Sequence, residues 1–65
     1  MNIGDKIKDA RLERGLQQKQ LAEKLHVGQT TISNWEKGVS EPSVDMIRQI
    51  AKILNCDANF LFGFD

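Results

Sequence analysis

The sequence contains only one cysteine and one histidine among its 65 residues. Cys56 therefore has no second cysteine in the chain with which to form a disulfide bond. Together with His26 it is also too small a set of ligands for a closed zinc site. We expect no metal and no cofactor, and a fold that is stabilised by its hydrophobic core alone.

Long apolar segments are missing as well. No part of the chain approaches the roughly 20 consecutive apolar residues that a membrane-spanning helix needs. The charged residues 5–9 do not fit a signal peptide. These absences predict a reduced, soluble, cytoplasmic protein that does not bind membranes.

The chain also lacks an excess of either charge, because nine Lys/Arg residues balance nine Asp/Glu residues. This balance excludes a strongly electropositive shell as the basis of nucleic-acid binding, so the placement of the charges must be considered. Residues 1–38 carry seven basic and five acidic side chains, whereas residues 39–65 carry two and four. The net charges of +2 and −2 indicate that the amino-terminal part is better suited to bind an anion.

Catalytic motifs are absent from the chain. It contains no Gly-rich phosphate loop, no pair of carboxylates in an apolar setting and no spacing typical of a nucleophile and its base. A binding module is therefore predicted rather than an enzyme.

The apolar spacing predicts an all-α fold of five short helices with tight connections. The first helix should span about residues 2–14, with Gly15 providing its left-handed end, and the second should run from Gln17 or Gln18 to Leu25. The third should cover residues 29–37. Ser43 is a good N-cap for a fourth helix and Asp57 for a short last one. The expected core face of the fourth helix holds Val44, Ile47, Ile50, Ala51 and Leu54.

The second and third helices are joined by a turn of about three residues, which is the spacing of a helix-turn-helix unit over about residues 18–37. Ala22 is a small residue at the point where two helices would cross at a steep angle. Ile32 is placed to fill the space that Ala22 leaves, and Trp35 should face inward beside it. This pair of helices is therefore the most informative part of the chain.

The outer face of the third helix is polar and mostly uncharged. Solvated helices are usually rich in Glu and Lys, whereas this face offers mostly residues that form helices poorly. A merely solvated surface is the alternative interpretation, but helix stability does not explain the choice of residues. The side chains in question are Gln29, Thr30, Ser33 and Asn34.

A pattern of residues runs through nearly the whole chain: Ile7, Arg11, Gly15-Leu16, Gln18, Leu21-Ala22, Leu25, Val27, Ile32-Ser33, Trp35-Glu36, Gly38, Pro42-Ser43 and Phe60-Leu61. In this pattern the chain resembles the phage-repressor and Cro type of helix-turn-helix proteins, also called XRE-like or lambda-repressor-like. The resemblance implies a single DNA-binding domain over residues 1–65. Its third helix would enter the major groove, and its second would lie across the DNA backbone.

The resemblance also implies which residues meet double-stranded DNA. The chemical groups of these side chains support the implied base contacts, because Gln and Asn amides can pair with the adenine edge and a Thr methyl group can pack on thymine. The base-reading residues would be Gln29, Thr30, Ser33 and Asn34. Phosphates would be bound by amide groups at the start of the second helix and around Gly38, and by the side chains of Gln18, Thr31, Lys37 and Ser40.

Other charged residues are assigned structural or solvent-exposed positions. In the resemblance, Arg11 and Glu36 match an ion pair that joins the first and third helices, so we assign them a structural role, in which loss of one partner would leave the other charge unpaired. The other cations are interpreted as solvated charges rather than phosphate ligands; they are Lys6, Lys8, Arg14 and Lys24.

His26 falls where these proteins usually have glycine in a left-handed turn. A pH switch at His26 is a weaker hypothesis than a histidine that the turn merely tolerates. Cys56 is expected to be a buried small apolar residue, and redox sensing would need an exposed thiol with a lowered pKa.

The predicted function is a non-enzymatic, sequence-specific regulator of transcription, a phage-type repressor that binds a palindromic operator as a homodimer. The resemblance implies a prokaryotic or phage-encoded protein in the nucleoid. The alternative is an antitoxin-type protein-interaction module with secondary DNA binding and autoregulation. Phe62 and Phe64 are candidates for a dimer or linker contact. The ending 60–65 resembles the point at which phage repressors continue into a linker, so one interpretation is an amino-terminal fragment of a longer repressor.

Overall fold

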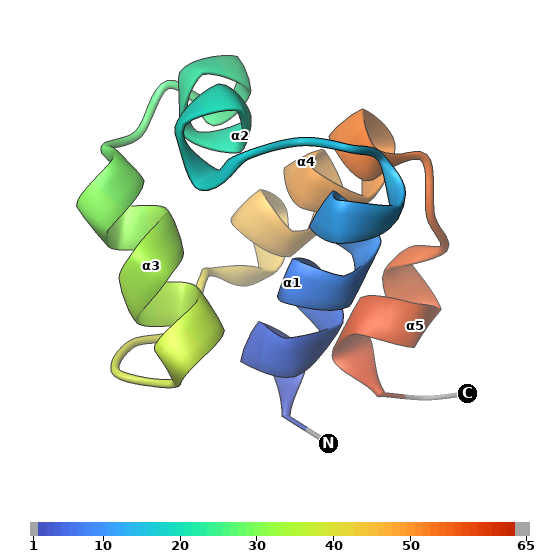
Figure 1. Cartoon of the computed structure of the whole chain (residues 1–65). Coiled ribbons are helices and arrows are strands. Elements are labelled where there is room, and N and C mark those ends of the chain that lie inside the picture. Colours follow the sequence, from blue (N-terminus) through green and yellow to red (C-terminus); the bar gives the residue numbers. More distant parts are fainter. Residues whose placement is uncertain (1, 64–65) are drawn as a thin grey trace.

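The computed structural model describes residues 2–63, and these form five helices (Figure 1). The helices are α1 (Ile3–Glu13), α2 (Gln18–Leu25), α3 (Gln29–Lys37), α4 (Val44–Leu54) and α5 (Ala58–Phe62). This confirms the all-α fold class and places the predicted helix boundaries within about one residue. In Figure 1, α3 lies at one side of the molecule, against α1 and α2, and α5 lies at the other.

The ends of the helices follow the local sequence. At the end of α1, the Gly15 amide donates to the Leu12 carbonyl at 3.0 Å and the Leu16 amide donates to the Arg11 carbonyl at 3.1 Å. Gly15 has a φ of 68°, so this is the Schellman ending that glycine favours. Gly38 closes α3 in the same manner, with a φ of 79°. These endings keep the connections short and confirm the predicted boundaries.

The turn of the helix-turn-helix unit depends on a left-handed histidine. His26 has a φ of 59°, and the following Val27 amide donates to the Ala22 carbonyl at 3.0 Å. A residue with a Cβ atom is strained in this conformation, by roughly 1–2 kcal/mol. The turn between α2 and α3 therefore stores a small amount of strain.

We expect His26→Gly to raise the free energy of unfolding by up to about 1 kcal/mol, because glycine adopts the left-handed conformation without the Cβ penalty. Equilibrium unfolding in urea, followed by circular dichroism, measures the change. Asn55 ends α4 with a φ of 51° and provides a matched control. Asparagine tolerates this conformation better, so Asn55→Gly should gain less. An unchanged or lower stability of the His26→Gly variant would show that the turn is not strained.

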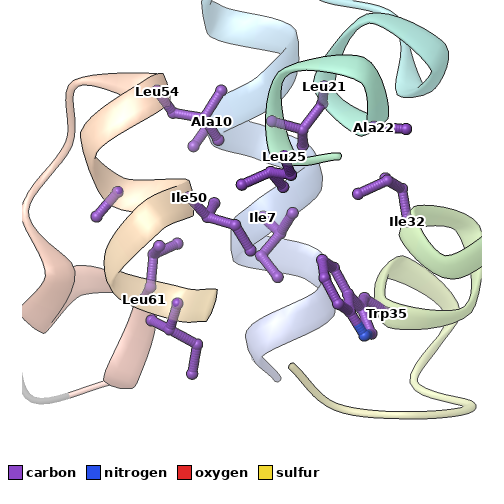
Figure 2. Packing of buried hydrophobic residues seen from close by; sticks show 12 residues of the cluster. Ile7, Ala10, Leu21, Ala22, Leu25, Ile32, Trp35, Ile50, Leu54 and Leu61 are labelled. Carbon is purple, nitrogen blue, oxygen red and sulfur yellow. The ribbon is translucent and has the colours of Figure 1, made fainter. Parts of the chain in front are cut away.

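The core is built by all five helices (Figure 2). Ala22 is 2% exposed and Ile32 is fully buried, and α2 packs directly against α3. Trp35 is 6% exposed and thus belongs to the core, as predicted. Because α3 is fixed by apolar contacts beneath it, its outer face is held in one orientation. The largest fully buried side chains are Ile7, Leu21, Ile32, Ile50, Leu54 and Leu61.

The prediction that Val44 belongs to the core was wrong. Its side chain is 53% exposed, because it occupies the first position of α4, at the edge of the apolar stripe and beyond the rest of the core. Val39 in the preceding loop is also exposed. Phe62, by contrast, is half-buried and packs against the core cluster, and Phe64 lies outside the described residues.

Two cations that we interpreted as solvated have partners in the fold. The Arg14 guanidinium donates to the carbonyl of Leu54 at 2.7 Å and to that of Asn55 at 3.2 Å. It therefore satisfies backbone acceptors that the end of α4 leaves unpaired. The Lys6 ammonium lies 5.5 Å from the centre of the Phe60 ring, within the range of a cation–π contact. Both interactions join α1 to the carboxyl-terminal helices, which the local sequence does not reveal.

Cys56 is half-buried, between α4 and α5. Burial raises the pKa of its thiol. The charge of Arg14 opposes this increase in pKa, and the charges of Asp57 and Glu13 add to it. A raised pKa reduces the thiolate fraction at neutral pH, and the thiolate is the reactive form. The environment of Cys56 thus disfavours the redox-sensing alternative.

Within residues 2–63, no helix combines the length and the apolar character needed to cross a lipid bilayer. The same residues contain no group of three or more histidine, cysteine, aspartate or glutamate side chains arranged to hold a metal ion.

Candidate nucleic-acid interface

An open groove separates the start of α2 from the outer face of α3. Its volume is about 460 Å³, and apart from Lys37 its lining is uncharged. The lining combines amide and hydroxyl groups, which can donate and accept hydrogen bonds. All four predicted base-reading residues share this groove with two of the predicted phosphate ligands. The residues are Gln18, Gln29, Thr30, Ser33, Asn34 and Lys37.

The four residues differ in how far they are exposed. Gln29 and Thr30, in the first turn of α3, are exposed, whereas Ser33 and Asn34 are half-buried. The amino-terminal residues of a recognition helix are those that usually contact base edges. The geometry of α3 therefore presents Gln29 and Thr30 most freely.

The other two predicted phosphate ligands lie outside this groove. Thr31 is half-buried on the side of α3, and Ser40 is exposed in the loop that follows the helix. The predicted phosphate site at the amides around Gly38 was wrong. The Gly38 amide donates to the Trp35 carbonyl at 3.2 Å, and the Val39 and Ser40 amides donate to the Asn34 carbonyl at 2.9 and 3.4 Å. These N–H groups close the end of α3 and are not free to bind an anion.

A buried ion pair lies beneath the groove. Arg11 Nε donates to Glu36 Oε2 at 2.7 Å, and Arg11 Nη2 donates to Glu36 Oε1 at 3.0 Å. Arg11 Nη1 also donates to the Leu16 carbonyl at 2.8 Å. Arg11 and Glu36 are 6% and 8% exposed. The two-point contact confirms the expected pairing and links α1 to the last turn of α3.

Gln18 connects this ion pair to the groove. Its side-chain amide donates to Glu36 Oε1 at 3.1 Å, while the residue also lines the groove. The start of α2 is thereby held at a defined distance from α3. Sequence reasoning placed Gln18 at the interface but missed its link to Glu36, because the two residues are separated by 18 positions and the contact exists only in the folded chain.

Gly4 has a role in positioning α3 that was not predicted from the sequence. A Cβ atom at this position would lie 2.3 Å from the Trp35 carbonyl oxygen and 2.8 Å from that of Glu36. The first turn of α1 therefore touches the backbone at the end of α3. A signal was present in the sequence, since glycine is a poor helix former and stands inside the first turn of a helix.

Comparison with known proteins agrees with this geometry. The sequence profile of the helix-turn-helix family matches residues 7–61. The chain belongs to this family. Over 65 residues it is 34% identical to the HTH-type transcriptional regulator ImmR of Bacillus subtilis, covering all of this chain and 51% of ImmR. It is 38% identical over 50 residues to the cryptic phage CTXphi transcriptional repressor RstR of Vibrio cholerae, covering 77% of this chain and 45% of RstR.

Solved structures of two DNA-bound regulators superimpose closely on this fold. The P22 c2 repressor, solved in complex with a synthetic operator, matches with a TM-score of 0.86 and 26% identity, covering 94% of this chain and 92% of that one. The Bacillus subtilis biofilm regulator SinR, solved in complex with DNA, matches with a TM-score of 0.85 and 30% identity, covering 92% and 97%. The helix-turn-helix chain described here spans about half the length of curated relatives such as ImmR and RstR.

Proposed function

We propose that this helix-turn-helix chain is the DNA-binding domain of a transcriptional regulator, and that it represses transcription by occupying operator DNA. The proposal rests on one observation above all: Gln29, Thr30, Ser33 and Asn34 line one groove on a helix whose opposite side is locked into the core. Two similar proteins were solved in complex with an operator or with DNA. In this proposal the bound protein excludes RNA polymerase from the promoter and catalyses no reaction, so it is not an enzyme.

In this proposal α3 lies in the major groove and α2 crosses the phosphate backbone. The amides and hydroxyls of the outer face pair with base edges, and Gln29 and Asn34 favour adenine. At the start of α2 the Gln17 amide donates to Gln20 Oε1 at 2.8 Å in a capping box. The amides of Gln18 and Lys19 precede the first acceptor that the helix can offer, so together with the Gln18 side chain they are suited to hold a phosphate. The side chains of Thr31 and Ser40 flank this contact surface and are proposed to touch the backbone on the two sides of α3.

A single domain presents one recognition helix, so we propose that two copies bind together. Two-fold symmetry would place the two α3 helices about 34 Å apart, which corresponds to half-sites one helical turn apart in a palindromic operator. Phe62 is a less suitable dimer contact than the sequence indicated, since it packs against the core. We further propose that the domain is the amino-terminal part of a longer, cytoplasmic, nucleoid-associated repressor, in keeping with the greater length of its relatives.

Selection of bound fragments from random double-stranded DNA tests the proposal. The wild-type chain is expected to select a sequence with two inverted half-sites. Gln29→Ala should lose the preference at one base pair of each half-site, by about 5- to 150-fold in relative affinity, while weak general binding survives. The readout is the base frequency at each position, combined with titration of single selected fragments.

Gln49 is an exposed glutamine on α4, away from the groove between α2 and α3, and provides a matched control. Gln49→Ala should select the same sequence as the wild-type chain. The proposed function is refuted if the wild-type chain enriches no common sequence. An unchanged selection by the Gln29→Ala variant would remove Gln29 from the base-reading set.

A further inference from the structure

Lys37 is the only charged residue in the lining of the groove between α2 and α3. Its side chain is exposed. The ion pair found among residues 2–63 joins Arg11 to Glu36, and Lys37 takes part in no ion pair within these residues. The ammonium group is therefore available to a ligand in the groove.

Lys37 lies on the outer side of α3, opposite the buried face of the helix. Residues advance by about 100° each along a helix, so side chains seven residues apart point in nearly the same direction. Lys37 thus lies along the same line as Thr30, opposite the buried Ile32 and Trp35. A helix that lies in the major groove directs this outer line at base edges. Lys37 lies on the line, at the carboxyl-terminal end of α3, whereas Thr31 lies about 100° away from it.

The surroundings of Lys37 disfavour a phosphate. Lys37 is the last residue of α3, and carbonyl groups there form the negative end of the helix dipole. The neighbouring amides of Gly38 and Val39 already donate to α3 carbonyls, so they add no phosphate donors beside the ammonium group. A base edge with acceptors only is a better ligand for this position than a phosphate is.

Guanine is the base that offers such an edge. Lysine has donors and no acceptor, and the major-groove edge of guanine presents two acceptors side by side, O6 and N7. Adenine presents an acceptor beside a donor. The uncharged residues of the groove include no other donor-only side chain. We propose that Lys37 reads a guanine at the edge of each half-site, next to the positions that the amides and hydroxyls read. This inference rests on the proposed function.

The experiment repeats the selection of bound fragments with wild-type chain, Lys37→Met and Lys37→Arg. The wild-type chain is expected to select a G·C pair at one edge of each half-site. Lys37→Met should lose this single preference by about 5- to 150-fold and keep the others, whereas Lys37→Arg should retain it, because arginine also pairs with O6 and N7. The affinity of each variant is then measured against salt concentration on the selected fragment and on a fragment with the G·C pair replaced.

Lys52 provides the matched control, since it is an exposed lysine in the last turn of α4, away from α3. Lys52→Met should select the wild-type sequence. The inference is overturned if Lys37→Met keeps the G·C preference, weakens binding equally on all sequences and lowers the salt slope by about one, as loss of a phosphate contact does. A wild-type chain that selects no sequence overturns the proposed function itself, and is thus a distinct result.

Discussion

Replacement of Arg11 by alanine is expected to destabilise the domain by about 3–5 kcal/mol, because Glu36 would stay buried without its counter-ion. The variant also loses the hydrogen bond from Arg11 to the Leu16 carbonyl. Domains of this size have a total stability of only about 3–10 kcal/mol. Most of the folded population should therefore be lost near physiological temperature, as measured by thermal and urea unfolding.

Two further variants separate the ion pair from other effects. Arg48→Ala removes an exposed arginine from α4 and should change stability by no more than about 0.5 kcal/mol. The double variant Arg11→Met, Glu36→Leu removes both charges and should recover part of the loss, since no charge remains buried alone. If Arg11→Ala melts like the wild-type chain but binds a different DNA sequence, Arg11 reads DNA and the structural assignment is wrong.

Gly4→Ala is expected to lower the free energy of unfolding by roughly 1–3 kcal/mol or more. The added methyl group would meet the carbonyl oxygens of Trp35 and Glu36 at 2.3 and 2.8 Å. Both are backbone atoms, so α1 must move away from α3 to make room. The direction of the effect is informative, because the same change inside an exposed helix stabilises it by about 0.5–1 kcal/mol. Urea unfolding gives the sign and the size.

Lys8→Ala provides the comparison for Gly4→Ala, since Lys8 is exposed on the same helix and should respond by about 0.5 kcal/mol at most. The displacement of α1 has a second readout. If Gly4 positions α3, the variant should show altered fluorescence of Trp35, the single tryptophan, under conditions where it is still folded. A Gly4→Ala chain that is more stable than the wild type would contradict the close contact between α1 and α3.

The candidate site was partly visible in the sequence. The face made by Gln29, Thr30, Ser33 and Asn34 follows from helical periodicity and from the poor helix propensity of its residues. Its confinement to one groove with Gln18 and Lys37 depends on the angle between α2 and α3. That angle is set by packing between residues distant in sequence, so the local pattern does not define it.

The sequence by itself determined where each helix begins and ends and which face of it is apolar. Caps, left-handed residues such as Gly15 and His26, and spacing of apolar residues act within one or two turns of the chain. Only the tertiary structure decided the exposure of Val44, the partners of Arg14 and Gln18, and the contact at Gly4. The contacts among them join residues that are 18 to 41 positions apart, for example Gln18 with Glu36 and Arg14 with Asn55. They depend on how the helices pack, because two side chains that are distant in sequence can contact each other only after the core has brought their helices together.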